Sequence, residues 1–445
     1  MSVNYNGRRY LDRFLQSVLA LDYPPACYRV AVVDNGSTDG SVELLRKQFP
    51  QVCLVQAGRN LGFAGGCNLG IRATASDYVA LVNNDTVVEP SWLRALVEVA
   101  ESDPRVGLVG SKILFLTPFL DVGLETLVAG SAGPSVSGAP ALLLHEARVV
   151  GCDYDKLVVR AGYLAASAEA GRFVRTLAGS ARLAVPVTRA DAPATLELTV
   201  RAASSRNDLN VAVMVGDAEI SRVAVTDTPR TIRLEASREI VTRAARDLIN
   251  NAGTRIDGGG RFGDRGIFEF DHGQYDRIAD VPALCGASVL LRRTMLEQIG
   301  GFDTRYFMYF EDVDLSWRAR RSGWRLLYTP HSRLRHVHAG TSGEGSPLWA
   351  FFVARNHLFW LIKHGTARAA LRAVSVFYVG VTVRALRAAV SRLRRRPGPD
   401  GIVELQIARS LTRYLPGLVV SRYRSPRADG TGRWTAVGNE GPASA

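Results

Sequence analysis

The stretch that decides the fold runs from Asp77 to Asp85 and reads DYVALVNND. Its apolar centre predicts a short buried strand, and Asp85 follows where that strand ends. Open α/β sheets bind ligands beyond the carboxyl ends of their strands. A carboxylate there suits Mg²⁺ or Mn²⁺, which take a few protein oxygens together with the phosphates of a substrate. Because an Asn-Asp pair after a strand is by itself more often a turn, the rest of the chain has to be weighed with it.

A second acidic segment, Glu311 to Asp314, lies far along the chain and precedes a helical pattern that ends at Arg321. Acidic residues also suit the first turn of a helix, where they face the positive end of its dipole. With Asp85, however, the segment offers a different arrangement. One carboxylate on a metal ion and one free to take a proton would serve to transfer a group from a nucleotide diphosphate.

Between Arg29 and about Leu114, short apolar strands alternate with amphipathic helices. The expected strands cover 30–33, 52–55 and 78–82, and the expected helices cover 41–49, 65–73 and 91–102. This alternation indicates an α/β fold with a parallel sheet and helices on both faces. We assign 1–117 to one half of this domain and 247–345, where the pattern resumes, to the other.

Between the two halves lies a segment of different character. Short β-type segments separated by turn residues predict an inserted all-β domain, a sandwich or jelly roll, over 118–246. It could bind carbohydrate, act as a spacer or mediate oligomers, and its sequence offers no site.

The net charge of +13 is concentrated near the C-terminus, where fifteen Lys or Arg stand against two acids between Arg355 and Arg427. These residues interleave with apolar and aromatic ones, which favours a helix lying on an anionic membrane over a nucleic-acid groove. The apolar run 373–383 is shorter than the roughly 20 residues that span a bilayer. We assign 346–424 to a basic, helical, membrane-associated region, with a solvated basic tail as the alternative, and 425–445 to a disordered tail.

Five cysteines without paired spacing argue for a reducing compartment and against a disulfide framework or a zinc site. The N-terminus lacks a basic-then-apolar signal segment. We therefore expect a cytoplasmic protein attached peripherally to the inner face of the cell membrane, with no nucleic-acid partner.

Three further segments are rich in the small and polar residues that approach ligands closely. Asn4-Tyr5-Asn6 stands near the start, and Asp34 to Ser41 reads as a strand end, a turn and a helix start. Arg59 to Gly70 carries four glycines in nine residues, a cost in backbone entropy that close approach of a nucleotide would explain. It is neither a Walker A loop nor a Rossmann fingerprint.

Further motifs complete an ordered set that is specific although each member is weak alone. The set is Asn4-Tyr5-Asn6, Asp34 to Ser41, Asn60 to Ala64, Asn83-Asn84-Asp85, Cys285 to Ser288, Gly300 to Asp303, Glu311 to Arg318 and His336. It resembles a family 2 glycosyltransferase with the GT-A fold, and within that family the rhamnosyltransferase and galactofuranosyltransferase branch. The resemblance covers about 1–117 and 247–365.

The resemblance implies a role for each site residue. Asp85 would bind Mg²⁺ or Mn²⁺ on the diphosphate, with His336 as a further metal ligand and His338 as a second candidate. Asp312 would be the catalytic base, with Glu311 beside it at the acceptor. Asp34 would hold the nucleobase. The implied nucleotide-sugar-binding set is Asn4, Tyr5, Asn6, Asp34, Asn60, Phe63, Asn68 and Asn84, with Asn83 as the alternative to Asn84 beside the sugar or ribose.

These roles predict an inverting, metal-dependent transferase with a single displacement at the anomeric carbon. We expect dTDP-L-rhamnose as donor, with UDP-galactofuranose or a UDP-hexose as alternatives, and a cell-envelope glycan or lipid-linked acceptor. The chain departs from the family in its β insert and in its first strand, before which only Met1-Ser2-Val3 stand. Either the native chain starts upstream or this strand is frayed.

Two other classes are weighed. A nucleotidyltransferase would carry a Gly-rich basic signature near residues 4–10, which the sequence lacks. An inactive glycan-binding scaffold would lose its carboxylates, yet Asp34, Asp85, Glu311 and Asp312 are all present.

Overall fold

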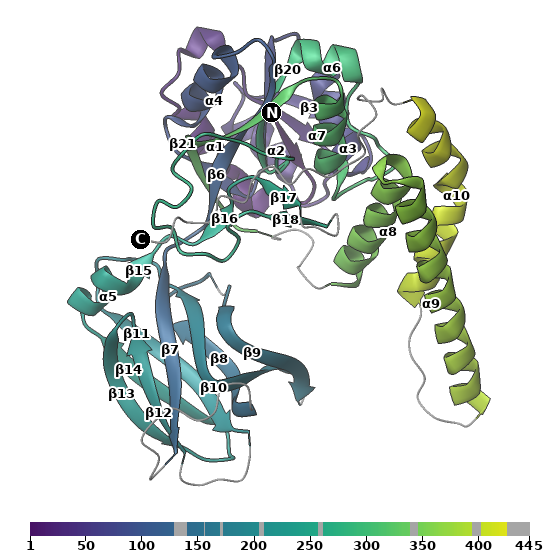
Figure 1. Ribbon diagram of the computed structural model, residues 1–445. Coiled ribbons are helices and arrows are strands. Elements are labelled where there is room, and N and C mark those ends of the chain that lie inside the picture. The colour runs from purple at the N-terminus through teal and green to yellow at the C-terminus, as the bar shows by residue number, and fades with distance from the viewer. Residues whose placement is uncertain are drawn as a thin grey trace. The chain divides into compact units, whose positions relative to one another are not determined.

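The computed structural model describes residues 1–128, 140–154, 156–169, 172–203, 209–256, 261–338, 346–393 and 402–424. Its contacts form two compact units. The first comprises 1–113, 251–265 and 275–445, and the second comprises 114–250 and 266–274. Each unit has its own hydrophobic core, so each is described by itself (Figure 1).

The first unit opens with a parallel sheet in the order β1-β2-β3 (Ser2–Asn4, Ala31–Asp34, Cys53–Gln56). Helices α1 (Arg8–Leu19), α2 (Ser41–Gln48) and α3 (Gly62–Arg72) and a 3₁₀ turn (Pro25–Cys27) lie between and after these strands. Helix α1 buries Leu11, Phe14, Leu15 and Val18, a spacing of three and four residues that makes one apolar stripe. Because the strands are parallel, Asn4 and Asp34 stand side by side at the carboxyl edge.

A mixed sheet continues this unit in the order β19-β21-β6-β20-β4, with β5 beside β21. The amide of Val82 donates to the carbonyl of Met1 at 3.1 Å, so β4 lies beside β1 in space. The elements are β4 (Tyr78–Val82), β5 (Thr86–Val88), α4 (Trp92–Glu101), β6 (Val106–Phe115), β17 (Thr254–Ile256), β18 (Phe262–Asp264), β19 (Ala279–Asp280), β20 (Ser288–Arg292), α6 (Arg293–Ile299), α7 (Glu311–Arg321) and β21 (Arg325–His336). This is the GT-A-like α/β arrangement expected from the sequence.

The second unit is the inserted domain, and its described residues are all-β apart from one short helix. Its elements are β7 (Phe119–Val128), β8 (Pro140–Val149), β9 (Val158–Glu169), β10 (Arg172–Pro186), β11 (Ala194–Ala202), β12 (Leu209–Val215), β13 (Ala218–Val225), β14 (Arg230–Ala236), α5 (Arg238–Ala244) and β15 (Ala245–Arg246), and β16 (Ile249–Asn251) leads out of it. Strand β11 alternates buried and half-buried residues, as a strand with one face on a core should.

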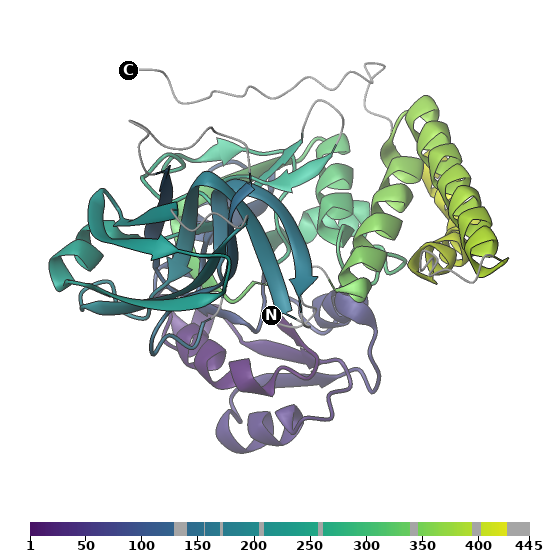
Figure 2. The ribbon, with the colours of Figure 1, turned by 90° about the horizontal axis from the view of Figure 1, so that it is seen from below.

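The expected two-sheet sandwich is corrected by the strand pairing. All nine strands belong to one antiparallel sheet, ordered β13-β12-β7-β10-β8-β11-β14, with β9 on β10 and β15 on β7. Strand β10 causes this continuity, because its first half pairs with β8 and its second half with β7. Strands β13 and β14 stand at the two ends of this order and also contact each other. The sheet therefore curls into a barrel-like domain (Figure 2).

The C-terminal helices α8 (Pro347–His364), α9 (Ala367–Leu393) and α10 (Ile402–Arg424) belong to the first unit. Helices α8 and α10 share a core with the loop before α7 that includes Tyr306, Phe359, Trp360 and Leu411. Helix α8 therefore packs against the α/β domain.

Helix α9 is different, because no residue of its apolar window is buried, although Ala373, Val374, Phe377 and Tyr378 are half-buried against the core of α8 and α10. Among the described residues it is the one helix long and apolar enough, over Ala367–Ser391, to cross a membrane by length and composition. The apolar run 373–383 identified from the sequence is thus part of a longer apolar helix.

The observed boundaries differ from the expected ones by a few residues. The insert begins at 114 rather than 118, ends at 250 rather than 246, and gains 266–274. The predicted tail 425–445 lies outside the described residues.

Candidate active site

The carboxyl edge of β1 and β2 carries a network of buried polar side chains. Asn4 Nδ2 donates to Asp34 Oδ1 at 3.2 Å and to Ser37 Oγ at 3.0 Å. Asp34 Oδ2 accepts from the amides of Gly36 and Ser37 at 3.1 and 3.0 Å. Asp34 thus forms the turn that its sequence suggests, and three of the roughly four acceptor positions of a carboxylate are taken.

The two residues after Asn4 lie at the surface. Tyr5 is 40% exposed, and Asn6 adopts a left-handed backbone with φ 50. Asn6 Oδ1 accepts from the amide of Thr38 at 2.8 Å, which ties this segment to the turn after β2. Tyr5 is therefore the member of Asn4-Tyr5-Asn6 whose side chain is open to a ligand.

The glycine-rich segment, 59–70, is held by a hydrogen bond within itself and by contacts with the loop before α7. Asn60 Oδ1 accepts from the amide of Gly62 at 2.9 Å and so starts α3. Gly62 has φ +73, and a Cβ there would lie 2.5 Å from Phe307, so this position requires glycine. Asn68 binds the backbone of Phe302 with both amide atoms at 2.8 Å. The structure thus uses Asn68 to fasten α3 to the segment before α7.

Asp85 and His336 come together because β5 pairs with the end of β21, where His336 stands opposite Thr86. His336 Nε2 lies 3.2 Å from Asp85 Oδ1, and both side chains are buried. The ring of His338 lies 6.0 Å from that of His336, because the chain turns beyond the strand at His338 with φ 59. Burial raises the pKa of Asp85, but the adjacent His336 outweighs it, and the net pKa lies below the ordinary value.

Asp312 stands in the first turn of α7 and is partly exposed. Its Oδ2 accepts from the amide of Gly286 and its Oδ1 from that of Val313, both at 2.8 Å. Burial, with the charge of Asp264, raises the pKa of Asp312 despite these hydrogen bonds. A carboxylate with a raised pKa is a stronger base than an ordinary one.

Glu311 is buried, and burial together with the charge of Asp312 raises its pKa well above the ordinary value. Its Oε2 has no hydrogen-bond partner among the described residues. Glu311 is thus harder to ionise than an ordinary glutamate, and Asp312 remains the candidate base.

A short path links the two acidic segments. The amide of Asn83 donates to the carbonyl of Ala287 at 3.0 Å, and Gly286, the residue before, donates to Asp312. A Cβ on Gly286 would lie 3.2 Å from the Phe63 ring. The structure thus brings Asn83, Phe63 and Asp312 to the same edge, where β4 ends and β20 begins.

Asn84 completes this edge. Its Nδ2 donates to Asn4 Oδ1 at 2.6 Å, which joins the end of β4 to the network at β1 and β2. Asp85 follows directly. Asn4, Asp34, Asn84, Asp85 and, through Gly286, Asp312 therefore lie at neighbouring strand ends, whereas Asn60 and Asn68 lie at α3.

Sequence reasoning missed one residue that acts on Asp312 and two residues that contact the loop before α7. Asp264 lies on β18 and acts on Asp312 by its charge. Arg355 and Asn356 lie on α8, in a stretch interpreted as membrane-binding. A signal was present, because arginine is seldom buried inside an apolar run such as FFVARNHLFW.

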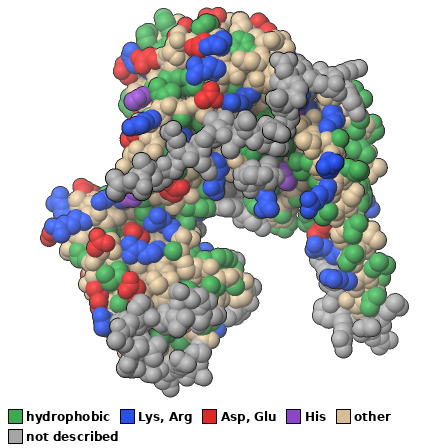
Figure 3. Space-filling view, in the orientation of Figure 1, with side chains coloured by type: hydrophobic (Ala, Val, Ile, Leu, Met, Phe, Trp, Pro, Cys, Tyr) green, Lys and Arg blue, Asp and Glu red, His purple; other side chains and the backbone are tan. Residues whose placement is uncertain are grey.

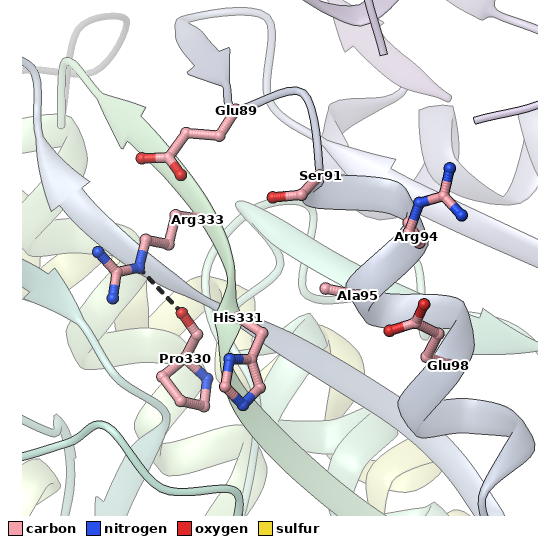
Figure 4. Close-up of a pocket in the computed structure, with 8 residues that line it drawn as sticks. All are labelled: Glu89, Ser91, Arg94, Ala95, Glu98, Pro330, His331 and Arg333. Carbon is pink, nitrogen blue, oxygen red and sulfur yellow. Dashed lines mark hydrogen bonds between the residues drawn. The ribbon is translucent and has the colours of Figure 1, made fainter. Parts of the chain in front are cut away.

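A surface hollow of about 480 Å³ lies between α4 and β21, and Figure 4 shows the residues that line it. It is lined by Glu89, Ser91, Arg94, Ala95, Glu98, Pro330, His331 and Arg333. Neither Asp85 nor Asp312 lines it, so this hollow is not the site defined by the strand ends.

The donor set allows a test of the expected metal. The described residues contain no group of three or more His, Cys, Asp or Glu side chains placed to hold an ion. They contain the pair Asp85 and His336, in which the buried Asp85 Oδ1 lacks a hydrogen bond. Mg²⁺ and Mn²⁺ are commonly held by one or two protein ligands with substrate phosphates and water, so the pair fits such an ion.

Comparison with known proteins identifies the class. A model described as "Glycosyl transferase family 2" matches residues 2–119, and one described as "Glycosyltransferase like family 2" matches 261–360. The chain belongs to glycosyltransferase family 2, which confirms the resemblance drawn from the sequence.

Individual relatives are similar to this chain at low sequence identity or over a small part of its length. The chain is 25% identical over 356 residues to "N-acetylglucosaminyl-diphospho-decaprenol L-rhamnosyltransferase" of Mycobacterium tuberculosis (strain ATCC 25618 / H37Rv), covering 77% of each protein. It is 35% identical over 109 residues to an uncharacterized glycosyltransferase of Nostoc sp., covering 24% of this chain and 33% of that one. Among solved structures, the mannosyltransferase PcManGT from Pyrobaculum calidifontis, in complex with GDP-Man and Mn²⁺, is 14% identical with a TM-score of 0.39, covering 95% and 86% of the two chains. A likeness at that TM-score carries no argument about the site.

Proposed function

We propose that the protein transfers L-rhamnose from dTDP-L-rhamnose to a lipid-linked or polysaccharide acceptor of the cell envelope, with inversion at the anomeric carbon. The observation that carries the proposal is the placing of two carboxylates along one edge. Asp85, paired with His336, follows the end of β4, and Asp312 is held by Gly286 just before β20. The printed name of the M. tuberculosis relative favours rhamnose and a polyprenol-linked acceptor.

In this mechanism Asp312 accepts the proton of the acceptor hydroxyl while that oxygen attacks the anomeric carbon. The bond from the anomeric carbon to the diphosphate oxygen breaks, and its electron pair leaves with the nucleoside diphosphate. One displacement inverts the configuration, so no residue has to act as a nucleophile. The raised pKa of Asp312 suits it to this task.

Asp85 and His336 would hold the divalent ion. When bound, such an ion supplies positive charge that stabilises the leaving diphosphate. Asn4, Asn84 and Asp34 order the turn beside it, where the nucleotide would lie.

We further propose that the protein lies on the cytoplasmic face of the cell membrane through α9. This helix exposes Leu371, Val376, Val379 and Leu386, each at 62% or more, beside several arginines. Figure 3 shows hydrophobic and basic side chains next to each other over this region. Apolar side chains flanked by basic ones suit an anionic lipid surface, where the acceptor's lipid would be anchored.

The test is release of nucleoside diphosphate from dTDP-L-rhamnose, UDP-galactofuranose and UDP-glucose, with an N-acetylglucosaminyl-diphospho-polyprenol acceptor and either Mn²⁺ or a chelator. We expect dTDP-L-rhamnose to be preferred. We expect Asp312→Asn to lower kcat about 10²- to 10⁴-fold with donor affinity unchanged. Asp12→Asn, at an exposed acid on α1, is the matched control. Turnover of Asp312→Asn at the rate of that control would remove Asp312 from the base role.

A further inference from the structure

The backbone just before α7 has an unusual conformation. Phe307, Tyr309 and Phe310 have φ values of 67, 67 and 69, so three bulky residues of the loop 306–310 lie in the left-handed region. We call this segment the aromatic loop. Left-handed backbone at such residues persists only where the surrounding structure holds it in place.

The holding groups come from α8. Asn356 Nδ2 lies 3.0, 2.8 and 2.7 Å from the carbonyl oxygens of Tyr306, Met308 and Tyr309, and its two N–H donors are shared among these three acceptors. Arg355 Nη2 donates to the carbonyls of Arg305 and Tyr306 at 3.0 and 2.6 Å. Five contacts from two neighbouring side chains thus satisfy the carbonyls that the loop turns toward α8.

These two side chains are themselves fixed. Asn356 is 0% and Arg355 is 6% exposed, and Arg355 Nε donates to Asn356 Oδ1 at 2.8 Å. The guanidinium lies 4.8 to 5.3 Å from the ring centroids of Phe351, Phe352 and Phe359. Among the described residues no carboxylate forms an ion pair with Arg355, so its charge is directed at the rings and the loop.

The aromatic loop ends at Phe310, directly before Glu311 and Asp312. On its other side, the Phe307 ring stacks on Phe352 at 5.3 Å, and the Phe307 carbonyl accepts from the amide of Ala64 at 3.2 Å. A change in the loop would therefore move the start of α7, where the candidate base stands.

We infer that Arg355 and Asn356 are positioning residues that hold the aromatic loop in its left-handed form and so fix where the Asp312 carboxylate lies. This inference rests on the proposed function, in which Asp312 is the base. Helix α8 then acts on the candidate base through these two side chains. Small displacements of a reacting group, of about 1 Å, can lower a rate by about 10²-fold.

The test compares Asn356→Asp, which keeps the shape but removes the two N–H donors, with Leu358→Ala on the same helix. Leu358 is buried in the core that α8 shares with α10, and no hydrogen bond joins its side chain to the aromatic loop. We expect Asn356→Asp to lower kcat about 10- to 100-fold, with donor affinity within about threefold of the wild type. Leu358→Ala should lower the denaturation midpoint while kcat stays near the wild-type value.

A second pair of variants, at Arg355, tests the inference even if Asn356→Asp fails to fold. Arg355→Lys keeps a charge and N–H donors and should retain more kcat than Arg355→Leu at equal donor affinity. Wild-type kcat in Asn356→Asp, or equal losses in Arg355→Lys and Arg355→Leu, would overturn the inference. The inference is also overturned if Leu358→Ala lowers kcat as much as Asn356→Asp does. If the wild type releases no nucleotide from any donor, or Asp312→Asn is fully active, it is the proposed function that fails.

Discussion

Replacing Asp314 by Asn tests how α7 is fastened to α8. Asp314 is fully buried, and its Oδ1 lies 2.6 Å from Lys363 Nζ and 2.7 Å from His364 Nε2. Its Oδ2 accepts from Arg318 Nε at 2.8 Å. Asp314→Asn removes the negative charge and leaves the buried Lys363 and the partly buried Arg318 with less compensation.

The structure sets the size of the effect. Breaking a buried ion pair by removing one partner costs about 3–5 kcal/mol. Lys363 keeps Asp303 at 2.8 Å, and Arg318 keeps the carbonyls of Ile299 and Gly301 at 2.7 and 2.6 Å. Because both cations retain partners, we expect the free energy of unfolding to fall by the lower end of this range, about 3 kcal/mol.

Tryptophan fluorescence during urea unfolding measures this loss in the relevant unit, because none of the six tryptophans lies in the inserted domain. Asp22→Asn, which breaks the exposed pair of Asp22 with Arg94, is the matched control and should cost less than about 1 kcal/mol. A loss for Asp314→Asn no larger than that of the control would refute the reasoning.

The pH dependence gives a second check. Burial raises the pKa of Asp314, but Arg318, Lys363 and His364 outweigh it and bring the net pKa well below the ordinary value. A carboxyl whose pKa is depressed by folding stabilises the protein above its unfolded pKa, about 3.9, and this contribution is lost as the pH falls through the folded pKa. The difference in the free energy of unfolding between the wild type and Asp314→Asn should therefore become smaller below about pH 4.

Three further predictions concern the site and the membrane. Asp264→Asn removes a charge that raises the pKa of Asp312, so the acid limb of the kcat/KM profile should move to lower pH; an unmoved limb contradicts this coupling. Asp85→Ala should weaken donor binding in titrations with Mn²⁺ and leave the weaker metal-free binding unchanged; equal affinity with Mn²⁺ removes Asp85 from the metal site. Replacing the exposed Val376 and Val379 of α9 by Glu should abolish flotation with phosphatidylglycerol liposomes while the fluorescence unfolding midpoint is kept; undiminished flotation rules out α9 as the contact.

Much of the α/β domain was predictable because its signals are local. The strand 78–82 was located to the residue, and helix α4 was expected at 91–102 and runs from Trp92 to Glu101. Their apolar spacing follows the period of the element that they form. In the insert the sequence predicted strands from β10 to β14 but not β7, β8 or β9. It did not predict their arrangement, because a continuous sheet and a sandwich share the same alternation.

The sequence by itself determined the element types, the order of the polar motifs and the concentration of positive charge at the C-terminus. Tertiary structure alone decided that Asn83 and Ala287 meet across neighbouring strands and that Asp264 raises the pKa of Asp312. It also decided that Arg355 and Asn356 hold the loop before Asp312 rather than face a membrane. The physical reason is that hydrogen bonds and charge interactions act between neighbours in space, and these neighbours are separated by tens to hundreds of residues along the chain.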